Sequence, residues 1–129
     1  MRTFEQYINE KVSPAEFRSI ELFADRLFSE LGIDVEFTKH FKDRVNDRRN
    51  DPPISAGELA AFFQKAFRRK GAEIAKLGKN SEALLNDIVK ELNLPFVYKW
   101  DGKNHEFDLV AKTIMRKANF KTKDKVMRF

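Results

Sequence analysis

Apolar residues recur at the three- to four-residue spacing of an α-helix in two long segments of the chain. The first segment opens with Ser13–Glu16, a capping box with a proline in the first turn, and ends at Gly32. The second opens with the capping box Ser55–Glu58 and extends to about Leu77, where Gly78 interrupts it. Both segments carry an aromatic stripe, so we expect two helices that pack against a core.

A shorter helix is expected between these two, from about Thr38 to Arg49. Phe41 and Val45 mark its buried side, because residues four apart lie on one helix face. The two prolines of the following segment, Asn50–Pro53, prevent the helix from continuing.

Strands are predicted where apolar and polar residues alternate or where β-branched and aromatic residues gather. These conditions hold at 33–37, at 96–100 and at 105–116, and they indicate a short last strand at 126–129. The Asp-Gly pair at 101–102 is a strong hairpin signal, so the second and third of these strands should be antiparallel neighbours.

Residues 81–92 allow more than one interpretation. Their apolar positions fit a helical period, but the segment is short, and an irregular connection or a strand at 82–87 fits as well. Helices come early in the chain and strands late, which indicates an α+β fold with a small antiparallel sheet packed against N-terminal helices. A length of 129 residues fits one domain, with an N-terminal segment and helix at 1–32 and the remaining elements at 33–129.

Charge is distributed unevenly along the chain. Residues 1–36 have four Lys or Arg against eight Asp or Glu, whereas residues 37–129 have twenty-one against twelve. The last eighteen residues hold seven basic side chains and one acidic side chain. A basic surface favours polyanions such as nucleic acid, although a lysine-rich surface also occurs in domains that bind none.

Several classes of protein and site are disfavoured by what the sequence lacks. There is no cysteine, which excludes disulfides and Cys-ligated zinc or iron–sulfur sites. No apolar run approaches the about 18 residues of a membrane span, and the start of the chain shows no apolar region of a secretory signal. There is no P-loop, dinucleotide-binding glycine motif or nucleophile elbow, and we expect neither a metal nor a cofactor.

The most informative candidate site is the set His40, Arg44 and Arg48, at i, i+4 and i+8 of the expected short helix. Successive members rotate only about 40° around a helix, so all three would share nearly one face. Arginine offers a rigid donor fork for phosphate oxygens, and histidine exchanges protons near neutral pH. The competing interpretation is a solvated face whose arginines form ion pairs with Asp43 and Asp47.

A second basic set follows the expected hairpin. If the strand continues to Arg116, alternation places Lys112 and Arg116 on one face and Thr113 and Lys117 on the other. These residues could meet the helix face described above, or they could form a basic edge strand that deters aggregation.

Two further candidates are weaker. Asp43, Asp47 and Asp51 could hold a divalent metal at their four-residue spacing, but the neighbouring Lys and Arg side chains favour salt bridges. His105 would begin a strand after a tight turn, and it is expected to be exposed rather than catalytic.

The helix Lys39–Arg48 resembles the H-x-x-x-R-x-x-x-R helix of phage-encoded RelE-like ribonucleases, within the wider barnase–EndoU–colicin–RelE group. The resemblance covers residues 35–129 and includes four further stretches: Pro53–Ser55, Glu58-Leu59, Leu94–Val97, and Leu109–Lys117 with Phe120. It implies a RelE/barnase-like fold with a small twisted sheet. The start of the chain, Phe4–Tyr7, resembles the short leading segments of some phage proteins destined for the virion.

The resemblance also implies a mechanism, the metal-independent cleavage of RNA by attack of a ribose 2′-OH on the adjacent phosphorus. His40 would transfer the proton, and Arg44, Arg48 and Arg116 would hold the phosphate that Thr113 orients. The nucleic-acid-binding residues would be Lys39, Lys112, Lys117, Phe120 and Lys121. The sequence departs from a complete acid–base pair, because no second well-placed His or Glu is found.

Three functions therefore follow from the sequence. The first is an endoribonuclease acting on mRNA or tRNA in the cytoplasm of a bacterial host. The second is a non-catalytic nucleic-acid-binding or virion-internal protein with the same fold. The third is a module that binds a host or virion protein through the acidic first helix.

Overall fold

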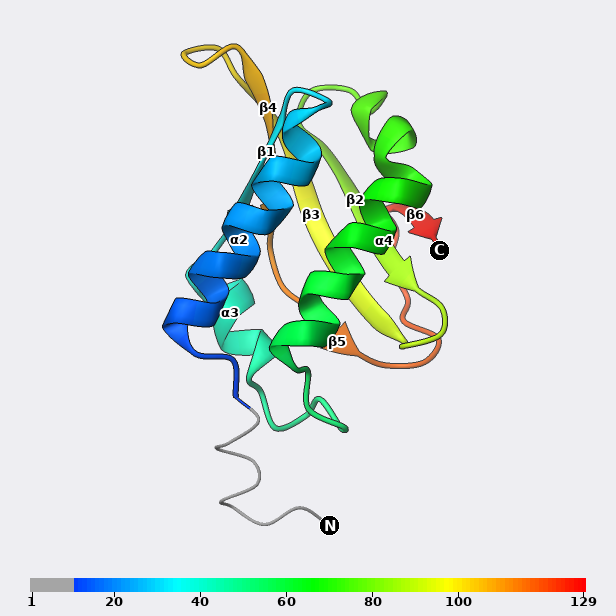
Figure 1. Cartoon of the computed structure of the whole chain (residues 1–129). Helices are drawn as coiled ribbons and strands as arrows, with labels where there is room; N and C mark the ends of the chain where they lie inside the picture. The colour runs from blue at the N-terminus through cyan, green and yellow to red at the C-terminus, as the bar shows by residue number, and fades with distance from the viewer. Residues whose placement is uncertain (1–10) are drawn as a thin grey trace.

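The computed structural model describes residues 11–129 (Figure 1). The expectations about a secretory signal and about Phe4–Tyr7 concern residues outside this range. In chain order the described elements are α2 (Pro14–Ser29), β1 (Ile33–Phe37), α3 (Lys39–Val45), α4 (Ala56–Ala75), β2 (Ser81–Asp87), β3 (Leu92–Asp101), β4 (Glu106–Ala111), β5 (Met115–Arg116) and β6 (Lys125–Arg128). No helix in the described part of the chain is long and apolar enough to cross a membrane.

The strands form one mixed sheet in the order β1-β4-β3-β2-β6, with β5 paired to β3. The α+β class is confirmed, but the expected antiparallel sheet is wrong at both edges. β1 is parallel to β4, and β6 is parallel to β2, whereas β2, β3 and β4 are antiparallel neighbours. Each edge strand pairs with a strand distant in sequence, which no local pattern of residues reveals.

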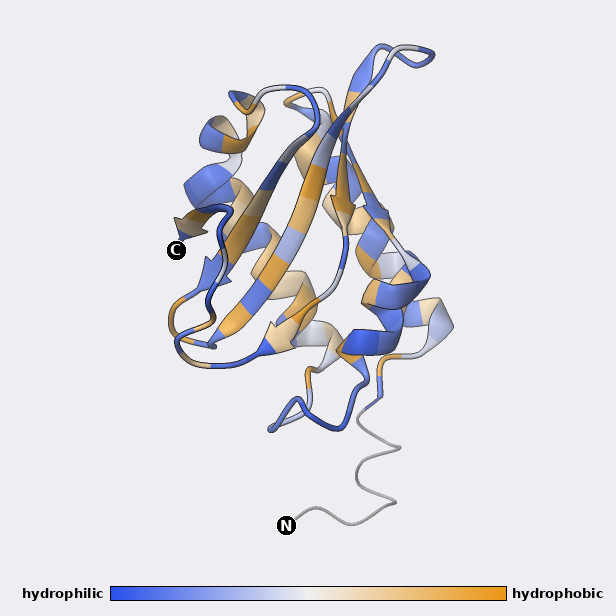
Figure 2. Ribbon diagram, turned by 180° about the vertical axis from the view of Figure 1, so that it is seen from behind, coloured by the Kyte–Doolittle hydropathy of each residue, from blue (hydrophilic) through white to orange (hydrophobic). Residues whose placement is uncertain are grey.

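Helices α2 and α4 cover one face of the sheet, as Figure 1 shows. The core lies between these two layers and is rich in phenylalanine. The ring of Phe37 on β1 lies 4.7 Å from that of Phe41 on α3 and 5.4 Å from that of Phe63 on α4. Figure 2 shows the other face of the sheet, which none of the described helices covers.

The expected long helices are confirmed. The hydroxyl of Ser13 accepts from the backbone N–H of Glu16, whose carboxylate accepts in return from the N–H of Ser13, so the capping box forms. At the start of α4, the hydroxyl of Ser55 accepts from the backbone N–H of Glu58.

Helix α3 is shorter than expected and ends at Val45 rather than Arg49. Two asparagine side chains accompany this end. Asn46 accepts from the backbone N–H of Val12 at 2.8 Å and donates to its carbonyl at 3.0 Å. The side-chain amide of Asn50 donates to the carbonyl of Arg44 at 2.7 Å, and the backbone N–H of Asp47 donates to the same oxygen at 3.1 Å. Polar side-chain contacts, one of them with the distant Val12, therefore accompany the end of the helix.

For the ambiguous segment 81–92 the strand alternative is confirmed, and one other strand expectation needs correction. Residues 81–87 form a strand rather than a helix, because β3 and β6 pair with the segment on both sides. The expected strand 105–116 is interrupted: β4 ends at Ala111, and only Met115–Arg116 rejoins the sheet. The hydroxyl of Thr38 donates to the carbonyls of Ala111 and Lys112 at the point where β4 ends.

Strand β1 is at one edge of the sheet, and carboxyl groups of α2 bind the backbone N–H groups along that edge. Asp25 accepts from the backbone N–H of Val35 at 2.6 Å, and Glu21 accepts from that of Phe37 at 2.7 Å. Side chains thus satisfy donors that an edge strand would otherwise leave unpaired. Burial raises the pKa of the Asp25 carboxyl to about 7, and the nearby Asp34 carboxylate adds to the increase against the opposing effect of the Val35 N–H.

This arrangement predicts that the protein loses stability as pH rises. The pKa of Asp25 in the folded state is above its ordinary value of 3.8, so the folded state holds the proton more tightly. The stabilisation is complete below about pH 4 and is lost as pH rises through about 7. We expect the melting temperature, followed by circular dichroism, to be higher by a few degrees at about pH 5 than at about pH 8.

The matched variant is Asp25→Asn, which keeps an oxygen that can accept from Val35 but cannot ionise. It should show a weaker dependence of melting temperature on pH than the wild type. The same dependence in both proteins would show that Asp25 does not control this titration.

Candidate functional site

The predicted residues His40 and Arg44 lie on α3, but Arg48 does not. His40 is exposed, and Arg44 is half-buried with its guanidinium 3.6 Å from the Asp47 carboxylate. Arg48 lies in the turn after the end of α3. The expectation of one helix face with all three residues is therefore wrong, because the helix ends before the third position.

Helix α3 is connected at both of its ends to the segment 111–116. At its start, the Thr38 hydroxyl donates to the carbonyl of Ala111 at 3.0 Å. At its end, Asn50 donates to the carbonyl of Arg44 and accepts from the backbone N–H of Arg116 at 2.9 Å. The helix that carries His40 therefore lies along the segment that carries the half-buried Thr113.

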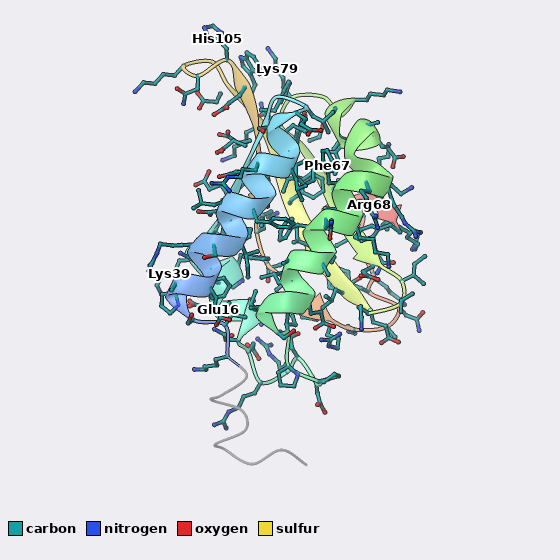
Figure 3. All side chains as sticks on the ribbon, in the orientation of Figure 1. Glu16, Lys39, Phe67, Arg68, Lys79 and His105 are labelled. Carbon is teal, nitrogen blue, oxygen red and sulfur yellow. The ribbon has the colours of Figure 1, made fainter. Side chains whose placement is uncertain are left out.

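Lys39 lies on a different side of α3, next to the first turns of α2 (Figure 3). There it lines a groove of about 350 Å³ together with Pro14, Phe17 and other residues of α2 and α3. Its ammonium lies 3.4 Å from the Asp43 carboxylate. The predicted nucleic-acid-binding role of Lys39 stays a prediction.

Arg116 is a buried connecting residue. Its guanidinium donates to the carbonyl oxygens of Pro52, Pro53 and Lys90 and forms an ion pair with the Glu58 carboxylate. Only 8% of the side chain is exposed. Its predicted role as a phosphate ligand would require the release of contacts that join the 50–53 loop, the start of α4 and the β2–β3 turn.

Other predicted charged residues are also engaged with the protein. The ammonium of Lys112 lies 3.0 Å from the Glu82 carboxylate across the sheet. Asp43 pairs with Lys39, and Asp47 pairs with Arg44 and Arg49, which confirms salt bridges as the contacts of these aspartates. His105 lies at the tip of the β3–β4 hairpin, where it is exposed (Figure 3).

A second groove, of about 320 Å³, lies on the uncovered face of the sheet. The segment after β5 contributes Lys117 and Phe120, and β6 contributes Arg128. Asn86 of β2 and Asn93 of β3 also line it. The structure thus brings together two predicted nucleic-acid-binding residues, and it adds one arginine and two asparagines that the sequence analysis missed. Lys121, which is exposed, follows Phe120 directly in the chain.

The buried Asn93 attaches the segment after β5 to the sheet. Its amide nitrogen lies 3.1 Å from the carbonyl oxygen of Met115 and 2.9 Å from that of Lys117. Because Asn93 is 1% exposed, these bonds form away from water, where an unpaired amide would be costly. The position of Lys117 beside the groove therefore follows from a buried side chain of β3.

The same uncovered face is acidic at its opposite edge, on β1 and β4. Carboxylate oxygens of Asp34, Glu106 and Asp108 lie within 4.8 Å of one another and form a group that could hold a cation. Burial raises the pKa of Asp108 to about 6, and Asp34 is the next contributor. Carboxylates thus gather on β1 and β4, whereas the groove beside β2 and β6 carries Lys117 and Arg128.

Comparison with protein-family models, with curated proteins and with solved structures gives no match to this chain. The resemblance to RelE-like ribonucleases therefore stays a prediction from short sequence motifs.

The buried contacts of Arg116 predict a structural role that can be measured. Arg116→Ala would leave the Glu58 carboxylate and three carbonyl oxygens without a partner in a part-buried place. We expect a loss of about 3 kcal/mol in the free energy of unfolding, measured by urea denaturation. The control Arg128→Ala removes the same charge from an exposed position and should change this energy by less than about 0.5 kcal/mol. Equal effects of the two variants would contradict the structural role.

Proposed function

We propose that this protein binds single-stranded RNA in the groove on the uncovered face of its sheet. One observation carries the proposal: Lys117, Phe120 and Arg128 line the same groove. The first two are predicted nucleic-acid-binding residues, and the third comes from a strand distant from the expected site.

The chemistry of the groove suits an RNA strand. Lys117 and Arg128 are exposed cations that can bind phosphate oxygens, and the half-exposed ring of Phe120 can stack on a base. The surrounding segment 112–129 holds seven basic residues and one acidic residue, which favours a polyanion. The carboxylates on β1 and β4 would repel phosphates and direct the strand toward β2 and β6.

The proposal predicts salt-dependent binding that depends on groove residues. A fluorescent single-stranded RNA of about ten nucleotides should bind at low salt, measured by anisotropy. Lys117→Ala and Arg128→Ala should each weaken binding and lower the slope of log affinity against log salt by about 0.7 per lost phosphate contact. Phe120→Ala should weaken binding by about tenfold with the slope unchanged.

The matched control is Arg68→Ala, on the exposed side of α4 and on the helical layer of the molecule (Figure 3). It removes one positive charge and should leave affinity within about twofold, since exposed charges far from a ligand are screened by salt. Equal losses of RNA affinity for Arg68→Ala and Arg128→Ala would indicate an effect of net charge alone and would contradict RNA binding in the groove.

Endoribonuclease activity is the second candidate, and the position of α3 favours it. His40 is exposed, and its helix is connected at both ends to the segment that carries Thr113. In the proposed step, the 2′-oxygen forms a bond to phosphorus as its proton passes to a base, and the bond to the 5′-oxygen breaks as this oxygen takes a proton from water. His40 would exchange the proton and Arg44 would stabilise the charge that develops on phosphate oxygens.

This candidate predicts cleavage of RNA in the presence of EDTA, with 2′,3′-cyclic phosphate ends detected by mass spectrometry. His40→Ala should lower the rate by at least about a hundredfold, the lower end of the contribution of general acid–base catalysis. His105→Ala is the matched control and should retain the wild-type rate. Equal rates for wild type and His40→Ala would show that His40 is not catalytic. RNA binding without cleavage would support the RNA-binding proposal and contradict the endoribonuclease candidate.

A further inference from the structure

Two asparagines in the groove form a directed chain of hydrogen bonds. The amide nitrogen of Asn93 donates toward the carbonyl oxygens of Met115 and Lys117, and that of Glu91 lies 3.3 Å away. Carbonyl oxygens only accept, so the amide nitrogen of Asn93 must face them. The amide oxygen of Asn93 then faces Asn86 and accepts from its amide nitrogen at 2.8 Å.

This chain fixes the orientation of the Asn86 carboxamide. One N–H of Asn86 is directed to Asn93, which is buried and cannot turn without losing its own bonds. Among the residues that the structure describes, none bonds to the amide oxygen of Asn86 or to its second N–H. A half-buried side chain thus offers one acceptor and one donor in a groove that it lines.

We infer that Asn86 recognises the edge of an adenine base held in this groove. The inference rests on the proposed binding of RNA and adds a preference for one base. Adenine presents an amino donor beside a ring-nitrogen acceptor, which matches the acceptor and donor of an asparagine amide. The groove volume of about 320 Å³ lies at the lower end of the range for small-molecule sites.

Neighbouring residues supply the remaining contacts. Phe120 stacks on the base, while Lys117 and Arg128 bind the flanking phosphates. Glu91 also lines the groove, and its carboxylate would be a second acceptor for an amino group. Uracil has no amino group. Its single N3–H can satisfy only one of the two acceptors, Asn86 and Glu91, and its carbonyl oxygens would face the other.

The wild-type protein provides the first test, which involves no folding defect. Three single-stranded RNAs are compared by anisotropy: a uridine strand, the same strand with one central adenosine, and one with purine riboside, which lacks the amino group of adenine but stacks similarly. We expect the adenosine strand to bind about tenfold more tightly than the other two. Equal binding of the adenosine and purine riboside strands would overturn the inference.

The second test uses Asn86→Leu, which has a similar shape and no amide. The preference for adenosine should fall below about twofold, while the salt slope remains that of the wild type. Gln64→Leu, an exposed position on α4, is the matched control and should keep the preference. A preserved preference in Asn86→Leu would overturn the role of Asn86. Absence of binding to all three strands by the wild type would instead contradict the proposed function itself.

Discussion

Three side chains position the chain after β4, where only the two-residue strand β5 pairs with the sheet. Asn50 accepts from the backbone N–H of Arg116, and Asn93 donates to the carbonyls on both sides of that residue. The guanidinium of Arg116 adds contacts with the 50–53 loop and Lys90. These buried polar groups stabilise the fold only when they are all satisfied, because an unpaired member is costly in a low-dielectric interior.

This network has consequences for both candidate functions. Through Asn50 it holds the end of α3, and with it His40 and Arg44, beside the segment 111–116. Through Asn93 it holds Lys117 at the groove on the uncovered face. Arg116, which the sequence resemblance assigns to catalysis, is thus held in contacts within the protein. The basic residues Lys117 and Lys121 that follow it are exposed.

Local patterns predicted the elements better than their pairing or the site. The capping box at Ser13 and the Asp-Gly hairpin depend on neighbouring residues, and both form as expected. At Ser55 the hydroxyl caps α4 as expected, but the Glu58 carboxylate pairs with the distant Arg116 instead of completing the box. The end of α3 and the interruption after Ala111 depend on contacts between distant segments, such as Asn50 with Arg116. The groove was missed for the same reason, because β2, β3, β6 and the segment after β5 meet only in the folded chain.

The central claim is that RNA occupies the groove on the uncovered face, and a map of amide chemical shifts tests it most directly. An isotope-labelled sample is titrated with a short adenosine-containing single strand, and the perturbed backbone amides are assigned. The account predicts changes concentrated at Asn86, Asn93, 117–120 and Arg128. Changes confined to the exposed surfaces of α2 and α4, with the groove amides unmoved at saturation, would contradict it.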